Sequence, residues 1–426
     1  MHDRVRKTCC RLVFLIVVAA PTLLMLSWGI ARNTSLVKQQ TKLHWQQQLA
    51  VKLGLKVTLA AVENPRPGLI VLRGAKLHDA ESGLDCGSIA IIRLSESAGQ
   101  QVVQLEDLQL QIAQRPETWQ WFVQHLLRQT GLGNVVISSG PVDFGALPGE
   151  LAAGSAEMGF ACHLRSEAER TTITVNLTNP RFADVPVAIQ VHRQHQASAE
   201  TQVTLDTAAT SLPCQLLLPL FPQLAALGEE TSFRGQLSAR ESVDGQLMEI
   251  AGEFSGVDLQ HWLGPVCAAG LTGSAQLQLQ RARIINDHCV QAAGRLIAEN
   301  GLVKRSLLRQ AARELGLQWI HDLGAEQGIY ERLSCRFDLD ESGIVLLGED
   351  QGRYAGSVLR HPHGVLLAAG VSPRRLSSQA LARSFGSPST AGLPLSRGAL
   401  RLLQGPGPQP VLQARPTPLP AATVPR

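Results

Sequence analysis

Residues 171–179, TTITVNLTN, carry Ile173, Val175 and Leu177 at every second position, with Thr or Asn between them. Successive side chains of a β-strand point to opposite faces of the sheet, so this stretch predicts a strand with one apolar and one polar face. Such alternation is typical of antiparallel strands that have one face in water.

The same alternation recurs in residues 185–194, VPVAIQVHRQ, and in residues 273–280, GSAQLQLQ. The residues that it places on the apolar faces are Val187, Ile189, Val191, Leu277 and Leu279. Gly- and Pro-containing turn signals separate the stretches, as expected for a long meander of strands. The chain is also low in charged residues (17%) and in aromatic residues (4%). We therefore predict a mostly β protein built on an elongated antiparallel sheet.

Three segments have the period of an amphipathic helix. Residues 41–54 present one apolar stripe and end at a glycine, and residues 116–131 repeat apolar side chains at i, i+3, i+4, i+7 and i+8. A third helix is predicted at about residues 303–318. Between the first two helices, residues 54–83 read as short strands, with Pro65 and Pro67 in the connection because proline cannot donate to a sheet ladder.

The N-terminal region contains nineteen consecutive uncharged residues, 12–30, LVFLIVVAAPTLLMLSWGI. This is close to the roughly 20 residues that cross a bilayer as a helix. Arg4, Arg6, Lys7 and Arg11 precede the run, so the positive-inside rule places the N-terminus in the cytoplasm and the rest outside. The anchor residues we expect in the membrane are Leu12, Phe14, Ile16, Leu23, Leu24 and Trp28.

A cleaved signal peptide is the competing interpretation of this run. The apolar part of a signal peptide usually extends to about 15 residues, which favours an uncleaved anchor. Either interpretation exports the bulk of the chain.

The C-terminal residues 371–426 hold seven Arg, no acidic residue and ten of the 23 Pro. Such a composition predicts a disordered basic tail. Because the basic residues gather in this tail, and because an exported chain meets little nucleic acid, we predict no nucleic-acid partner.

No sequence motif for catalysis or cofactor binding is present. The chain has no nucleophile elbow, zincin motif, P-loop or Rossmann fingerprint, so we predict neither an enzyme nor a cofactor. Two histidine pairs, His192 with His195 and His361 with His363, lack convergent metal ligands nearby. The eight cysteines have no zinc or redox spacing, and most are interpreted as small buried apolar residues.

The repeated apolar strand faces are the one collective feature. A closed sandwich core would hide them, and so would a curled sheet whose apolar trough holds a ligand with an apolar body. The predicted membrane anchor makes lipid the natural occupant of such a trough. Its contact residues would be Ile173, Val175, Leu177, Val187, Ile189, Val191, Leu277 and Leu279.

Several segments resemble the AsmA-like proteins of bacterial envelopes, including their TamB relatives. A single N-terminal membrane helix is followed by a strand–hinge–strand pattern, matched by Gly54, Val57, Val62, Pro67, Gly68, Leu72, Leu77 and Asp79. Towards the C-terminus, residues 292–317, AAGRLIAENGLVKRSLLRQAARELGL, are similar to the family's strands followed by a helix. Residues 330–349, YERLSCRFDLDESGIVLLGE, are similar to its closing hairpin.

The resemblance implies a taco-like β-groove, a role in outer-membrane biogenesis or phospholipid movement, and no catalytic residues. It divides the chain into a cytoplasmic stub and anchor (1–31), a chorein-like segment (32–134), a β-groove region (135–370) and the tail (371–426). The family members that bridge two membranes are much longer than this chain.

The expected function is therefore lipid binding or transfer by a protein anchored once in the inner membrane, with its bulk in the periplasm. Membrane lipids are the expected partners. One alternative is a non-catalytic envelope assembly factor that binds protein partners and uses the Arg-rich tail to contact an acidic partner. The other alternative is an exported hydrolase.

Overall fold

The computed structural model describes residues 35–377, except for residues 81, 113, 129–132, 145–157, 180–181, 196–199, 243–244, 268–269, 287, 323, 351–353 and 370–374. Of the described residues, 59% are in strands and 19% in helices, which confirms the mostly β fold. The chain divides into two compact units, and the division falls within the strands β11 (Thr201–Asp206) and β13 (Ser232–Ser242).

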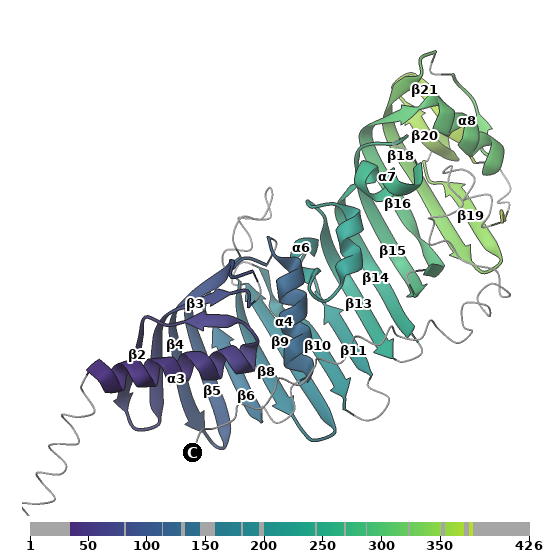
Figure 1. Cartoon of the computed structure of the whole chain (residues 1–426). Helices are drawn as coiled ribbons and strands as arrows, with labels where there is room; N and C mark the ends of the chain where they lie inside the picture. The colour runs from purple at the N-terminus through teal and green to yellow at the C-terminus, as the bar shows by residue number, and fades with distance from the viewer. Residues whose placement is uncertain are drawn as a thin grey trace, which may run out of the picture. The chain divides into compact units, whose positions relative to one another are not determined.

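Unit 1 contains residues up to 197 and residues 203–235 (Figure 1). Its helices are α3 (Ser35–Leu53), α4 (Pro116–Arg128), α6 (Cys214–Leu217) and the 3-10 helix η2 (Pro222–Leu227). Its remaining strands are β1 (Lys56–Thr58), β2 (Ala61–Arg66), β3 (Leu69–His78), β4 (Asp85–Ser97), β5 (Gln100–Leu110), β6 (Asn134–Ser139), β7 (Val142–Asp143), β8 (Gly159–Ser166), β9 (Arg170–Asn179), β10 (Phe182–Gln194) and β12 (Leu212–Pro213).

The unit 1 sheet is mixed, which corrects the prediction of a purely antiparallel sheet. Antiparallel pairs join β3 to β4, β4 to β5, β6 to β8, β8 to β9 and β9 to β10. In contrast, β5 runs parallel to both β6 and β7. Parallel neighbours need a crossover of a dozen or more residues, and α4 supplies it between β5 and β6.

The first hairpin also differs from expectation. Pro65 lies inside β2 rather than in the connection, and the turn is formed by Pro67 and Gly68. The ladder between β2 and β3 has a register shift between Glu63 and Arg66. Proline is tolerated at position 65 because the shifted ladder needs no backbone N–H donor there. Gly68, at φ +79°, adopts the left-handed conformation that the turn needs.

The two predicted N-terminal helices are present, and Figure 1 shows α3 and α4 on the same side of the unit 1 sheet. Gly54 ends α3 with a φ of +69°, and its N–H donates to the carbonyl of Ala50 at 2.8 Å. A buried stripe on α4 includes Trp119 and Leu127, which are 7% and 4% exposed. The apolar side of α4 therefore forms part of the unit 1 core.

Unit 2 contains residues 198–202 and residues from 236 onward. Its helices are α7 (Leu259–Cys267) and α8 (Arg305–Glu314). Its remaining strands are β14 (Gly245–Asp258), β15 (Ser274–Ile285), β16 (His288–Lys304), β17 (Gln318–Trp319), β18 (Gln327–Asp340), β19 (Gly343–Gly348), β20 (Ser357–His361) and β21 (Gly364–Ala368). The third predicted helix is thus confirmed as α8, whereas α7 was not predicted.

Strand β18 organises unit 2 because it pairs with three strands. It lies antiparallel to β16, while β19 pairs with its residues 335–340 and β20 with its residues 332–333. The turn between β18 and β19 falls at residues 341–342, within the predicted DESG hairpin turn. The face that carries Cys335 also carries Leu333 and Leu339, and all three side chains are less than 10% exposed.

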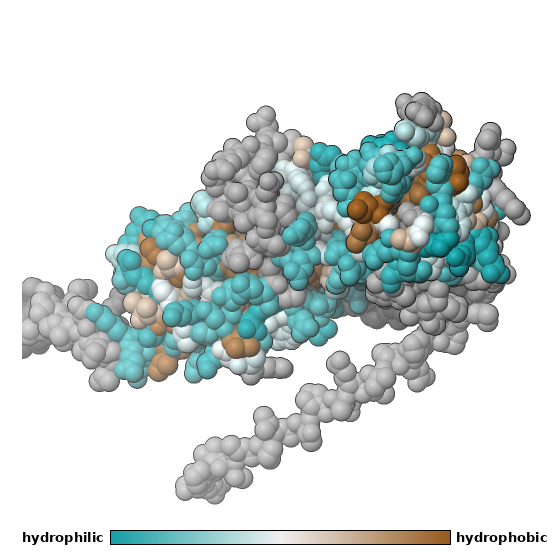
Figure 2. Space-filling model, turned by 90° about the horizontal axis from the view of Figure 1, so that it is seen from above, coloured by the Kyte–Doolittle hydropathy of each residue, from teal (hydrophilic) through white to brown (hydrophobic). Residues whose placement is uncertain are grey.

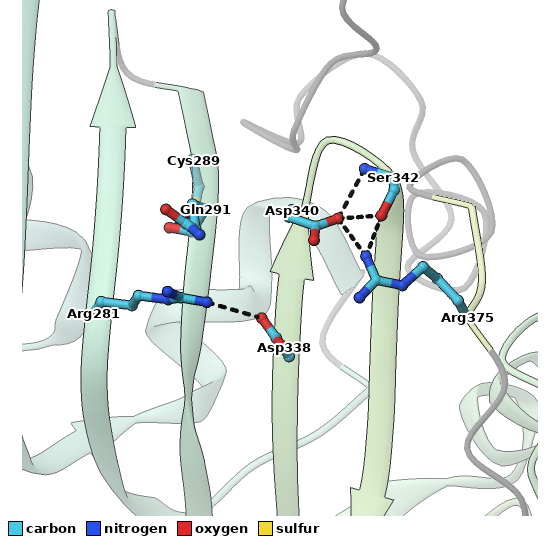
Figure 3. Close-up of polar contacts among 7 residues, drawn as sticks. All are labelled: Arg281, Cys289, Gln291, Asp338, Asp340, Ser342 and Arg375. Atoms are coloured by element: carbon cyan, nitrogen blue, oxygen red, sulfur yellow. Dashed lines mark hydrogen bonds and ion pairs between the residues drawn. The ribbon is translucent and has the colours of Figure 1, made fainter.

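The segment predicted to be a disordered tail includes described residues that have regular pairing. The N–H groups of Leu376 and Ile344 donate to each other's carbonyls at 2.8 Å, which forms a bridge on β19. Arg375 binds Asp340 at 2.5 Å and also contacts Ser342 (Figure 3). Residues 375–377 therefore pack on unit 2, and the remainder of the predicted tail lies outside the described residues.

Candidate functional site

The six candidate residues of unit 1 lie on one face of two neighbouring strands. In the β9–β10 ladder, Ile173 lies opposite Val191, Val175 opposite Ile189 and Leu177 opposite Val187. The alternation in residues 171–179 and 185–194 therefore places all six side chains as three cross-strand pairs.

The adjacent strands extend each pair into a row. The β8–β9 and β6–β8 registers add Leu164 and Val135 to the first row, Cys162 and Ile137 to the second, and Phe160 and Ser139 to the third. No charged residue interrupts the three rows. The added residues were missed in the sequence, although Phe160, Cys162 and Leu164 also follow a period of two.

Burial differs along the rows. Ile173, Val187 and Val191 are 8%, 2% and 3% exposed, so they belong to the core of unit 1. The side chains of Val175 and Ile189 in the middle row remain half-buried. We call Val175 and Ile189, with Leu177, the accessible part of the apolar face.

Hydrogen-bonded polar side chains border the apolar rows on both faces of these strands. On the same face as the rows, Thr171 lies two residues before Ile173; it is fully buried, and its hydroxyl lies 2.8 Å from Nε2 of His195 and 3.2 Å from the hydroxyl of Ser166. On the opposite face, Nδ1 of His192 lies 3.3 Å from the hydroxyl of Thr172. The first histidine pair thus joins strand side chains. In the described part of the chain no three His, Cys, Asp or Glu residues gather as metal ligands.

The other two candidates, Leu277 and Leu279, belong to unit 2. Leu277 lies opposite Phe254 on β14 and Leu296 on β16, and Leu279 lies opposite Gly252 and Gly294. They are 5% and 9% exposed, so they contribute to the unit 2 core. The structure does not bring them into the three rows of unit 1.

The polar face of unit 2 carries ion pairs between acidic residues and arginines. Glu349, with 11% of its side chain exposed, binds Arg336 at 3.0 Å and also pairs with Arg295. Asp350, equally buried, lies 3.6 Å from Arg332 and 3.7 Å from Arg360. These acidic residues follow β19 directly, a position that sequence reasoning did not select. Their negative charge is compensated by arginines on the strands.

A further ion pair on this face joins two strands that are not adjacent. Arg281 of β15 points towards Asp338 of β18 at 3.9 Å across the intervening strand β16 (Figure 3).

Near the start of α8, Arg305 pairs with Asp322, and the carbonyl of His321 accepts the indole N–H of Trp319 at 2.6 Å. His321 and Asp322 therefore make local contacts within unit 2.

Five cysteines of the two units have described side chains. Cys86, Cys162, Cys214 and Cys335 are buried, and Cys289 is half-buried; all five are free thiols. Burial raises the pKa of Cys162 and Cys289 to about 11 and that of Cys214 to about 12. Thiols with such raised pKa values are poor nucleophiles and poor metal ligands at neutral pH.

The visible surface of the described residues is mostly hydrophilic, with small apolar patches (Figure 2). The predicted anchor residues, Leu12 to Trp28, lie outside the described residues. Among the residues that the structure does describe, no helix combines the length and apolarity required to cross a membrane.

Comparisons of the chain with protein-family models, with curated proteins and with solved structures find no match.

Proposed function

We propose that this chain is a membrane-anchored, AsmA-like envelope protein that binds or transfers lipids through the apolar face of a curled, groove-forming sheet. The observation that carries the proposal is the set of three uncharged rows across β6, β8, β9 and β10, in which Val175 and Ile189 stay half-buried. The proposal assigns the protein no catalytic residue and no cofactor.

The chemistry of the rows suits an acyl chain. Neighbouring strands lie about 4.8 Å apart, so a row across four strands is about 14 Å long. Except for the Ser139 hydroxyl and the Cys162 thiol, the side chains along the rows offer no hydrogen-bond donor or acceptor. Each Å² of apolar surface removed from water contributes about 25 cal/mol. Such a surface selects for an apolar body without selecting a particular headgroup.

The cellular location that we propose rests on the sequence. The run at residues 12–30, preceded by four cationic residues, would hold the protein once in the inner membrane with its N-terminus inside. Both units would then lie in the periplasm, and the strands of unit 1 would begin close to the membrane that supplies the lipid.

Site-specific photocrosslinking in cells tests the proposal. A photoreactive amino acid is introduced at Val175 or at Ile189, and mass spectrometry identifies what is attached after irradiation. The matched controls are Thr174 and Gln190, which pair with each other on the opposite face of the same two strands.

We expect phospholipid adducts at Val175 and Ile189 and none at Thr174 or Gln190. Adducts of equal yield on both faces would indicate non-specific contact with lipid. An absence of lipid at all four positions in a correctly folded protein would refute the lipid-binding proposal.

The second candidate function is a non-catalytic assembly factor that binds envelope proteins. Its specific support is the bridge between Leu376 and Ile344, which shows that the edge of β19 accepts an extended segment. Deleting residues 378–426 preserves this bridge and removes most of the basic tail. An assembly factor that uses the tail should lose its partners, whereas a lipid-binding face should retain its lipid adducts.

A further inference from the structure

Helix α3 exposes apolar side chains that its packing does not explain. Val37, Leu43 and Val51 are 37%, 51% and 75% exposed, although α3 packs on β1 and β2. On α4, Trp121 is 46% exposed. We call these four residues the α3 surface.

Trp121 is held beside the C-terminal end of α3. Its ring stacks on His125 with a centroid distance of 5.0 Å, and Nε2 of His125 lies 3.3 Å from the carbonyl oxygen of Val51. A Cβ atom at Gly54 would come within 2.3 Å of the Trp121 ring, so the indole fits closely against the end of the helix. The exposed tryptophan and the exposed Val51 therefore belong to one surface.

The charged residues of α3 and of the segment that follows it are all positive. Residues 35–62 contain Lys38, Lys42, Lys52 and Lys56 and no acidic residue. The first acidic residue after α3 is Glu63. Lys38, Lys52 and Lys56 are exposed. Exposed aliphatic and tryptophan side chains near exposed lysines suit contact with the interface of an anionic membrane.

The chain also limits how far α3 can be from the predicted anchor. Four residues, 31–34, separate Ile30, the end of the uncharged run, from Ser35, the first residue of α3. Five peptide steps reach at most about 18 Å. If residues 12–30 span the bilayer, as the proposed function assumes, the start of α3 lies within this distance of the headgroups.

We propose that the α3 surface rests on the bilayer that holds the anchor and binds its anionic phospholipids. The lysines contact the phosphate-bearing headgroups, and Val37, Leu43, Val51 and Trp121 enter the interfacial layer. This contact would set the orientation of the unit 1 sheet towards the membrane. The inference rests on the proposed anchor and is independent of lipid binding in the apolar rows.

Quenching of tryptophan fluorescence by brominated lipid tests the contact. The full-length chain is reconstituted in nanodiscs of brominated phosphatidylcholine, with or without phosphatidylglycerol, and compared with Trp121→Phe. The matched control is Trp319→Phe, because Trp319 lies on β17 of unit 2, outside the α3 surface. We expect Trp121→Phe to remove a distinct part of the quenching, and Trp319→Phe to leave that quenching unchanged.

Two further variants test the chemistry. Val51→Glu changes a side chain that is 75% exposed, so folding should be unaffected while Trp121-dependent quenching falls by half or more. Combined Lys38→Gln, Lys42→Gln and Lys52→Gln substitutions should abolish the extra quenching that phosphatidylglycerol produces.

The possible failures are distinguishable. Trp28 lies in the predicted anchor and reports its insertion through the quenching that remains when Trp121 and also Trp45 of α3 are replaced by Phe. If this anchor quenching is present and Trp121 contributes nothing in either lipid, the α3 surface does not contact the membrane. If the chain does not enter nanodiscs at all, both the anchor and this inference are wrong.

Discussion

At the scale of single residues, Val175 is the position that distinguishes the proposed lipid-binding face from a closed core. Its side chain is half-buried opposite Ile189. We expect Val175→Asp to remove lipid adducts from a photoreactive residue at Ile189, because a carboxylate would hydrate the middle row. Water can reach this position, so the free energy of unfolding should fall by only about 1–2 kcal/mol.

The matched control for that prediction is Thr174→Asp, on the opposite face of the same strand, which should keep the lipid adducts. Urea unfolding and crosslinking yield are measured on both variants. Aggregation of Val175→Asp together with a stable Thr174→Asp would show that Val175 is a core residue.

Asp340 provides a pH-dependent contact at the same scale. Hydrogen bonds from Arg375 and then from Ser342 lower the pKa of its carboxyl to about 2, below the usual value of about 3.9. A lowered pKa in the folded state means that the ionised carboxylate stabilises the fold above about pH 4, and that this contribution disappears as the pH falls towards 2. The pair is partly exposed, which keeps the contribution small.

Arg375→Ala tests this contact. We expect a small decrease in the urea midpoint at pH 6 that shrinks progressively between pH 4 and pH 2.5. The amide protons of Ile344 and Leu376 should exchange faster in the variant at pH 6. A midpoint difference that stays constant down to pH 2.5 would contradict the assigned role of Asp340.

At the scale of elements, α8 is attached to unit 2 mainly through one side chain. Leu308 is 1% exposed, and the helix packs on β16 and β17. Leu308→Ala should lower the free energy of unfolding by about 2–5 kcal/mol, because it removes buried methyl groups and leaves a cavity. Hydrogen exchange in β17 should accelerate as well.

The neighbouring substitution Arg309→Ala is the control, since Arg309 is exposed and should change stability by less than about 0.5 kcal/mol. Equal effects of the two substitutions, measured by urea unfolding, would mean that helix propensity rather than burial of Leu308 determines the attachment of α8.

Elements that depend on local chemistry were predictable. The period of α4, the glycine stop of α3 and the hairpin turn after β18 were all identified from nearby residues. The short helix α7 was missed because it has only nine residues and contains Gly264 and Pro265, which usually mark the end of a helix, although its apolar residues have helical spacing. The position of Pro65 inside β2 was missed because the register shift that accommodates it is a property of the pairing with β3.

At the scale of the whole molecule, labelling of the buried thiols can show whether each unit is folded. Cys162 and Cys214 belong to unit 1, and Cys335 belongs to unit 2. Burial raises the pKa of Cys335, like that of Cys214, to about 12. At pH 8 only about one such thiol in 10,000 is ionised, and burial further prevents reagent access.

We therefore expect N-ethylmaleimide to leave Cys162, Cys214 and Cys335 unmodified in the native protein at pH 8. Peptide mapping by mass spectrometry across a urea series should show the first two labelled when unit 1 unfolds and Cys335 labelled when unit 2 unfolds. Rapid labelling of any of the three without urea would contradict the packing described for its unit.

The sequence by itself determined which side chains share a strand face, where the main helices lie and the absence of recognisable catalytic motifs. These properties depend on alternation, helical period and capping, which act between residues close in the chain. Only the tertiary structure decided that β5 and β6 are parallel, that Ile173 is buried while Val175 is half-buried, and that Arg375 docks on Asp340. Alternation specifies the face to which a side chain points, whereas the neighbouring strand and the cover over that face arise from contacts between residues distant in the sequence.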